Sequence, residues 1–351
     1  MLSTDTELSI GMLAYNEEPR IREALQTLFT QDVFKQFATE VVIVPNGCTD
    51  GTAGVASQIV ESYRPELPVC CSARVVEIQT AGKSNAWNQF VQKLSARTAK
   101  VLVLMDADVV LLGASTISSM VNTLTTNPEA VVCVDRPVKD IAENPNSIFQ
   151  RLLARITPEI NPNNIPLCAQ LYCAYSGELR RITLPVEITV EDGFLRALLL
   201  TRGFTQPEDL ERIVLDSNSK HRFASVATLR EAFRHEMWIV TGSIINMSLF
   251  RLFSANCSGN LTAMRLMDAK QAQNVNWLKE YVQQEVKIRG WRLLPKDWWV
   301  RRWSRLKRLS VGKKLLQSPI TLAAAGMDAV VFVAAIWNLR RGAELGSWWR
   351  T

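Results

Sequence analysis

The chain has 351 residues and a formal net charge of +6, and 47% of its residues are hydrophobic. This length allows one large domain with an appendage or two domains, and the composition provides enough apolar residues to bury a core. Seven cysteines, an odd number without CxxC spacing, argue against a disulfide framework and a zinc site and favour a reducing, cytoplasmic setting.

Strand and helix patterns alternate over the first 135 residues. The first five residues lack the basic segment and apolar run of a secretory signal. Helices are predicted from about residue 16 to 30, after residue 52 and after residue 82. Apolar runs predict strands over residues 8–14, 40–45, 74–78, 101–105 and 130–134. This alternation predicts an α/β fold in which helices flank a parallel sheet.

Two carboxylates, Asp106 and Asp108, follow the fourth predicted strand. Open α/β sheets bind ligands beyond the carboxyl ends of their strands, and alternate residues point the same way. Carboxylate oxygens suit Mg²⁺ or Mn²⁺, which often share their coordination with substrate phosphates. The alternative interpretation is a solvated turn that carries two acidic residues.

Polar residues that follow the other strands are predicted to gather at the same edge of the sheet. Asn16, Glu17, Asn46 and Lys83 provide amide, carboxylate and ammonium groups that together suit a nucleotide. Taken alone, Asn46-Gly47 is an ordinary turn and Lys83 is a surface charge at a helix start.

The strict alternation ends near Asp135. The pattern then predicts an amphipathic helix over residues 147–156, a strand over 168–175, a hairpin over 210–223 and a long helix over 226–253, which Gly242 interrupts. Glu191 and Asp192 precede a further helix, where acidic residues suit the helix dipole. With only His221 and His235 as histidines, the chemistry is expected to rest mainly on carboxylates.

Several motifs occur in an order that resembles family 2 glycosyltransferases with the GT-A fold. The resemblance covers about residues 6–250 and rests on residues 14–18 (AYNEE), 45–52 (PNGCTDGT), 82–88 (GKSNAWN), 106–108 (DAD), 176–181 (SGELRR) and Glu191-Asp192. It implies a mixed, mostly parallel, Rossmann-like sheet flanked by helices. It also implies an inverting transfer of a sugar from a nucleotide-sugar donor, with a UDP-sugar as the expected donor.

The resemblance also implies roles for individual residues. A Mn²⁺ or Mg²⁺ ion would be held by Asp106 and Asp108. Asp192 would take the proton of the acceptor hydroxyl, and Glu191 would orient Asp192 or an arginine. The metal would offset negative charge on the leaving phosphate. The donor would contact Ala14, Asn16, Glu17, Asn46, Lys83, Asp106, Ala107 and Asp108, and the acceptor Gly177, His235 and Trp238.

Three segments depart from the family pattern. Ala14 stands where the family usually has proline, and Pro45-Asn46 replaces a pair of aspartates. The sequence therefore does not identify the nucleobase of the donor. Residues 234–238 (RHEMW) match the Gln-x-x-Arg-Trp motif of processive members only at Trp238, which argues against a processive synthase.

The C-terminal part is basic and rich in tryptophan. Residues 287–351 carry 14 Lys/Arg and three Asp/Glu, a net of +11, whereas residues 1–286 carry 26 and 31, a net of −5. This mixture suggests nucleic acid or an anionic membrane, and the apolar segment 320–337 favours the membrane. Its 18 residues are short for a span and Asp328 is costly inside one, so a helix in the membrane interface or against a second copy is favoured. A buried C-terminal helix is the alternative.

The sequence thus predicts a catalytic domain over residues 1–253 and a helical, membrane-associating extension over residues 254–351. Within the first, residues 1–135 would bind the donor and 136–253 the acceptor. The expected acceptor is a carbohydrate or a lipid-linked hydroxyl at the cytoplasmic face of a membrane. The sequence is also compatible with a homo-oligomer. Two rival interpretations are a degenerate transferase fold kept as a membrane scaffold and a phosphatase of the haloacid-dehalogenase type.

Overall fold

The computed structural model describes residues 5–140, 164–224, 228–294, 303 and 311–342. The predicted helix over residues 147–156 lies outside these residues. Contacts divide the chain into two compact units. The first comprises Met1–Val186 and Glu191–Ser225, and the second comprises Glu187–Val190 and Val226–Thr351.

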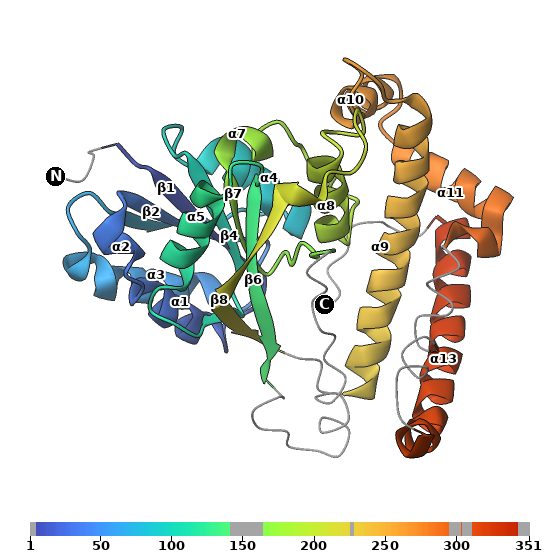
Figure 1. Cartoon of the computed structure of the whole chain (residues 1–351), viewed down its shortest axis with the longest axis horizontal. Coiled ribbons are helices and arrows are strands. Elements are labelled where there is room, and N and C mark those ends of the chain that lie inside the picture. The colour runs from blue at the N-terminus through green and yellow to red at the C-terminus, as the bar shows by residue number, and fades with distance from the viewer. Residues whose placement is uncertain (1–4, 141–163, 225–227, 295–302, 304–310, 343–351) are drawn as a thin grey trace. The chain divides into compact units, whose positions relative to one another are not determined.

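One eight-stranded sheet forms the centre of the first unit (Figure 1), in the order β3-β2-β1-β4-β7-β6-β8-β5. The strands β3, β2, β1 and β4 are mutually parallel, β6 and β8 are parallel, and the pairs β4–β7, β6–β7 and β5–β8 are antiparallel. The strands are β1 Leu8–Ala14, β2 Thr39–Pro45, β3 Ser72–Val75, β4 Val101–Asp106, β5 Val110–Leu111, β6 Val132–Lys139, β7 Leu171–Tyr175 and β8 Ile213–Phe223. The predicted mixed, mostly parallel sheet is confirmed.

Helices cover both faces of the parallel part of the sheet. Alternate residues of β1 and β4 pack into a core with α1, α3 and α5. The other face receives α4 and the π-helical turn Phe90–Leu94, where a side chain at Gly11 would collide with the ring of Phe90. Because both faces are buried, these strands have the continuous apolar sequences that predicted them. The helices are α1 Ile21–Phe29, α2 Val33–Gln36, α3 Thr52–Tyr63, α4 Lys83–Gln89, α5 Thr116–Thr126, α7 Ser176–Leu179 and α8 Glu191–Leu200, with 3-10 turns at Arg64–Glu66 and Leu210–Arg212.

The predicted hairpin over residues 210–223 is wrong. β8 is a single strand of 11 residues that runs through the expected turn, and its pairing with β6 shifts register between Val134 and Arg136. The buried carboxylate of Asp216 accepts hydrogen bonds from the Asn218 amide and from the Ser219 hydroxyl, which also donates to the carbonyl of Thr116. A sequence typical of a turn therefore forms an irregularity inside a strand.

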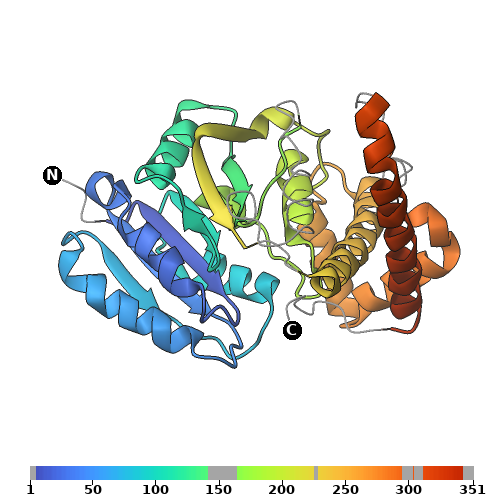
Figure 2. The ribbon, with the colours of Figure 1, turned by 90° about the horizontal axis from the view of Figure 1, so that it is seen from below.

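Helices make up most of the second unit, in which α9 packs against α11 and α13 (Figure 2). These helices are α9 Leu229–Asn256, α10 Ala263–Gln273, α11 Trp277–Arg289 and α13 Val311–Arg340, with a 3-10 turn at Gly290–Leu293. Gly242 does not interrupt α9. It allows a close approach, because a side chain there would collide with Thr189 and Val190, and Asn246 donates to the carbonyl of Val190 at 2.8 Å.

By their contacts, the two units divide at Ser225/Val226, before α9, whereas the functional boundary after residue 253 stays a prediction. The contacts divide there because α9 is one uninterrupted helix of 28 residues whose packing partners follow it in the chain. Among the residues that the structure describes, Arg230–Asn256 is the one helix long and apolar enough to cross a membrane, judged by length and composition only. A buried core helix passes the same test, and 44% of this apolar window is buried.

Candidate active site

A lysine between two carboxylates lies at the carboxyl end of β4. Lys83 begins α4, Asp106 ends β4 and Glu191 begins α8. The Lys83 ammonium is 2.8 Å from Asp106 Oδ2 and 3.0 Å from Glu191 Oε1. Burial alone would lower the pKa of Lys83, but the charges of Asp106 and Glu191 raise it above its usual value. Lys83 therefore stays protonated and joins three segments that are far apart in the sequence.

Negative charge exceeds positive charge in this cluster. Burial raises the pKa of Asp106 to about 7 against the opposing effect of Lys83, and the charges of Asp108 and Glu191 add to the rise. Oxygen Oδ1 of Asp106 is buried and accepts no hydrogen bond within the described part of the chain. A buried carboxylate oxygen without a donor is costly, so it is a position that a cation would stabilise.

The two carboxylates of the predicted metal pair suit a hard divalent cation. Asp106 and the largely buried Asp108 offer oxygen ligands at one edge of the sheet. No group of three or more His, Cys, Asp or Glu side chains placed to hold a metal occurs among the described residues. A complete cage made of protein ligands is therefore not formed there. Mg²⁺ and Mn²⁺ fit this arrangement, because they commonly take one or two carboxylates and complete their shell with phosphates and water.

Asp192 has the properties of a general base. It lies in the first turn of α8, beside Glu191, and its Oδ1 accepts a hydrogen bond of 2.7 Å from the amide of Gly193. Burial, with the adjacent charge of Glu191, raises the pKa of Asp192 to about 6. A carboxylate with a pKa near neutrality is a stronger base than an exposed aspartate and is still ionised at pH 7.

The predicted nucleotide loops are joined to each other. Asn16 has a positive φ of 50°, and its side-chain oxygen accepts a 2.8 Å hydrogen bond from the amide of Thr49. The amide of Glu17 donates to the hydroxyl of Thr52 at 2.8 Å. These bonds fasten the loop after β1 to the loop after β2, so residues 33 and 35 positions apart in the sequence form one surface.

Asn46 is buried completely, and its amide bonds to the backbone. It donates to the carbonyl of Ala14 at 2.6 Å and accepts from the amide of Gly82 at 3.0 Å. The side chain therefore connects the end of β1 to the residue before Lys83. Both polar atoms of the amide thus bond to the backbone, and the contact of Asn46 with the donor stays a prediction.

A buried aspartate–histidine pair lies next to this site, and the sequence interpretation missed it. The Nδ1 atom of His221 is 2.8 Å from both carboxylate oxygens of Asp135, and Nε2 is 3.4 Å from Oε1 of Gln170. The carbonyl of Gln170 accepts a 2.8 Å bond from the amide of Asp106. The two pair residues are 86 positions apart, and His221 was assigned to a hairpin. Its rarity as one of two histidines was the only available signal.

Tyr172 and Cys168 are two further neighbours that the sequence did not indicate. The hydroxyl of Tyr172 accepts a 2.6 Å hydrogen bond from Nε1 of Trp87, and burial raises its pKa. Burial also raises the pKa of the Cys168 thiol to about 12, and the charges of Asp135 and Asp192 contribute. Both groups stay neutral, so they shape the site without adding charge.

The predicted acceptor residues belong to different units. Gly177 lies in α7 of the first unit, with open space at its Cα. His235 and Trp238 lie on α9 of the second unit, where their rings stack with centroids 6.2 Å apart. Their role toward an acceptor stays a prediction.

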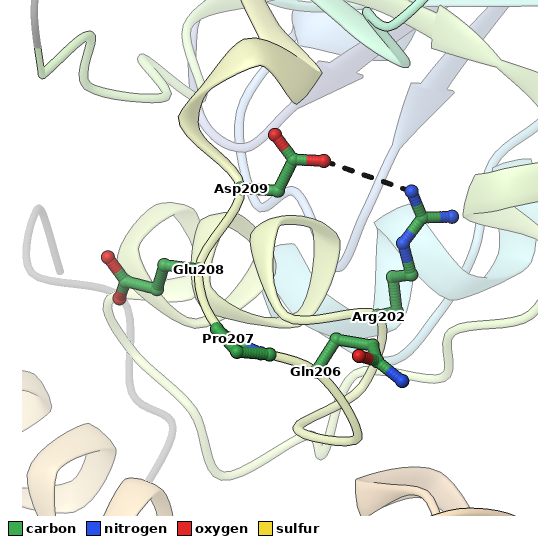
Figure 3. A pocket seen from close by; sticks show the side chains of 5 residues that line it. All are labelled: Arg202, Gln206, Pro207, Glu208 and Asp209. Carbon is green, nitrogen blue, oxygen red and sulfur yellow. Dashed lines mark ion pairs between the residues drawn. The ribbon is translucent and has the colours of Figure 1, made fainter.

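A surface pocket follows α8 (Figure 3) and is lined by Arg202, Gln206, Pro207, Glu208 and Asp209. The Arg202 guanidinium and the Asp209 carboxylate are 3.8 Å apart. None of the five lining residues is a predicted site residue, and the pocket contains none of the residues of the buried cluster around Lys83. The pocket is therefore not the candidate active site.

Comparisons with known proteins bear on the family and the fold. A family model described as glycosyl transferase family 2 matches residues 9–181. The fold is similar to that of the mannosyltransferase PcManGT from Pyrobaculum calidifontis, solved with GDP-Man and Mn²⁺, with a TM-score of 0.55 and 18% identity over 95% of this chain and 87% of that one. S. aureus TarS residues 1–349 match with a TM-score of 0.48 and 18% identity over 96% of this chain and 92% of that one. No curated protein sequence matches the chain.

The matched region contains β1, β2, β4, β7 and the loops that carry Asn16, Lys83, Asp106 and Asp108. The glycosyl transferase family 2 model therefore matches just under half of the chain, residues 9–181, and the sheet of the first unit has the predicted GT-A fold.

Proposed function

We propose that the first unit transfers a sugar from a nucleotide-sugar donor, with a UDP-sugar as the expected donor, to an acceptor hydroxyl with inversion. The observation that carries this proposal is the cluster of four carboxylates around Lys83 at the carboxyl edge of the sheet, with Oδ1 of Asp106 buried and unpaired. Such a cluster suits a ligand that brings both a divalent cation and a diphosphate.

Each residue has a separate task in this proposal. Asp106 and Asp108 would hold Mn²⁺ or Mg²⁺, which when bound stabilises negative charge on the leaving diphosphate. Lys83 contributes a fixed positive charge beside Asp106, and Asn46 holds the backbone at Gly82 that positions Lys83. The joined loops of Asn16 and Glu17 form the seat for the nucleoside.

Proton transfer is assigned to Asp192. The acceptor hydroxyl loses its proton to the Asp192 carboxylate as its oxygen attacks the anomeric carbon, and the bond to the diphosphate breaks on the opposite face. Glu191, which is 3.0 Å from Lys83, keeps the start of α8 against the site. No covalent intermediate is needed, so the protonated thiol of Cys168 has no chemical part.

The acceptor and the place of action are also proposals. The basic, tryptophan-rich C-terminal part supports an acceptor that is lipid-linked or lies at a membrane surface, on the cytoplasmic side. His235 and Trp238 are the acceptor residues expected from the second unit.

The proposal is tested by thermal-shift measurements with UDP, GDP, CDP and dTDP, each with and without Mn²⁺. A ligand that binds only the folded state raises the melting temperature by mass action. We expect a Mn²⁺-dependent rise with UDP, which Asp106→Asn/Asp108→Asn abolishes. If no nucleotide shifts the melting temperature of the folded protein, with or without Mn²⁺, the scaffold interpretation replaces that of an enzyme.

A further inference from the structure

The helix α13 has two apolar faces, only one of which is used inside the protein. Its buried face carries Val331, Phe332, Ala335 and Leu339, and the helix packs against α9 and α11. A second set of apolar residues on the same helix is exposed to solvent: Leu322, Val330, Val333 and Trp337, each between 51% and 63% exposed.

These exposed residues form one continuous stripe. Together with the exposed Gly326, they follow one another at intervals of four, four, three and four residues, which is the spacing of one helix face. From Leu322 to Trp337 the stripe is about 22 Å long at 1.5 Å per residue. Single exposed apolar residues are common, but a stripe of this length indicates a surface that is covered by a membrane or by another molecule.

The charges around the stripe point to an anionic lipid surface. Arg340 and Arg341 are exposed at its C-terminal end, and the Arg341 guanidinium lies 3.7 Å from the centroid of the Trp337 ring. The only acidic residue of α13, Asp328, is 5% exposed, so it does not oppose a negative surface. Tryptophan beside arginine is typical of the membrane interface, where an apolar ring and a cation meet the headgroups.

The position of Asp328 also decides how the helix would meet the bilayer. A carboxylate in the middle of a membrane crossing is costly, whereas a helix that lies in the interface keeps one side on the protein. In α13 the carboxylate is on the protein side and the apolar stripe is on the free side.

We propose that the stripe Leu322–Val330–Val333–Trp337, with Arg340 and Arg341, is a membrane-binding face that lies in the headgroup region of an anionic bilayer. The inference rests on the membrane association in the proposed function and not on sugar transfer. Binding to vesicles is measured without donor or acceptor, so its failure leaves the thermal-shift result with nucleotides unaffected.

The test is co-flotation of the full chain with vesicles of phosphatidylcholine containing about 30% phosphatidylglycerol, compared with pure phosphatidylcholine. We expect binding to the anionic vesicles that weakens at high salt, because ions screen the attraction of Arg340 and Arg341. Val330→Glu/Val333→Glu is expected to reduce the bound fraction about tenfold or more, since it places two negative charges in the stripe. Arg340→Gln/Arg341→Gln is expected to reduce binding to anionic vesicles while leaving the apolar residues intact.

The matched control is Val275→Glu/Leu261→Glu, which changes the net charge equally at two exposed apolar positions outside α13. It should bind like the unaltered chain. Folding of each variant is checked by circular dichroism and by the nucleotide thermal shift. The proposal would be overturned if the Val330/Val333 variant bound anionic vesicles as well as the unaltered chain does. It would also be overturned if the unaltered chain did not bind them. A dimer, seen by sedimentation without vesicles, that this variant dissociates would overturn it as well, because the stripe would then bind a second copy.

Discussion

Two buried clusters of ionisable side chains lie close together in the first unit, and they differ in how completely their polar atoms are paired. In the pair of Asp135 and His221, both ring nitrogens have a partner and both residues are almost completely buried. In the cluster around Lys83, one ammonium faces Asp106 and Glu191, with Asp108 and Asp192 nearby, and an oxygen of Asp106 has no donor among the described residues.

This difference separates structure from reactivity. A buried network whose polar groups are all hydrogen-bonded adds rigidity and specifies one arrangement of the core. A buried cluster with excess negative charge destabilises the protein without ligand, and it is typical of sites where a bound ligand balances that charge. The pair connects to the cluster around Lys83 through Gln170, whose carbonyl accepts the amide of Asp106. We therefore expect substitutions in the two clusters to have opposite profiles of activity and stability.

The largest expected effect is on catalysis at Asp192. Asp192→Asn keeps the shape of the side chain but removes the proton acceptor, so the rate of transfer should fall by about 10³-fold. Nucleotide binding and the melting temperature should hardly change. Initial rates with a donor that shifts the melting temperature provide the measurement, and full activity in this variant would remove Asp192 from the mechanism.

The opposite profile is expected at His221. His221→Ala leaves the carboxylate of Asp135 buried without its partner, which should lower the free energy of unfolding by about 3 kcal/mol. Replacing both residues, as in Asp135→Leu/His221→Leu, should recover part of this loss, because no unpaired charge is left. Urea unfolding of the single and double variants measures both values. A double variant less stable than His221→Ala would show that the pair is not an isolated unit.

The pH dependence of transfer follows from the raised pKa of Asp192, which is about 6. A base must be ionised to accept a proton. With saturating Mn²⁺, which would keep Asp106 ionised, kcat/KM should be constant above this value and fall about tenfold per pH unit below it. A pH–rate profile between pH 5 and 8 measures the midpoint. A midpoint near pH 4, typical of an exposed aspartate, would contradict the burial of this carboxylate.

The smallest effect is expected at Asn46. Asn46→Ala removes two buried hydrogen bonds to the backbone and should lower the free energy of unfolding by about 1–2 kcal/mol. The nucleotide that gives the largest thermal shift should stay the same. A change of preferred base in this variant would instead show that Asn46 contacts the nucleobase.

The sequence by itself determined most of the parallel part of the sheet. Buried parallel strands need continuous apolar residues, so β1, β2 and β4 were predicted almost to the residue. Their order along the chain then placed Lys83 and Asp106 at one edge. The third strand was shifted, because Ser72–Val75 lies at the edge of the sheet and is only partly buried.

Tertiary structure alone decided the rest. The turn signal at residues 216–218 is local. The strand continues through it, because the Ser219 hydroxyl bonds to the Asp216 carboxylate and to the carbonyl of Thr116 in α5. The bonds of the Asn46 amide to Ala14 and Gly82 join residues 32 and 36 positions away, which the sequence did not indicate. The pairing of Asp135 with His221, and the two faces of α13, likewise depend on contacts between distant segments, which no local pattern records.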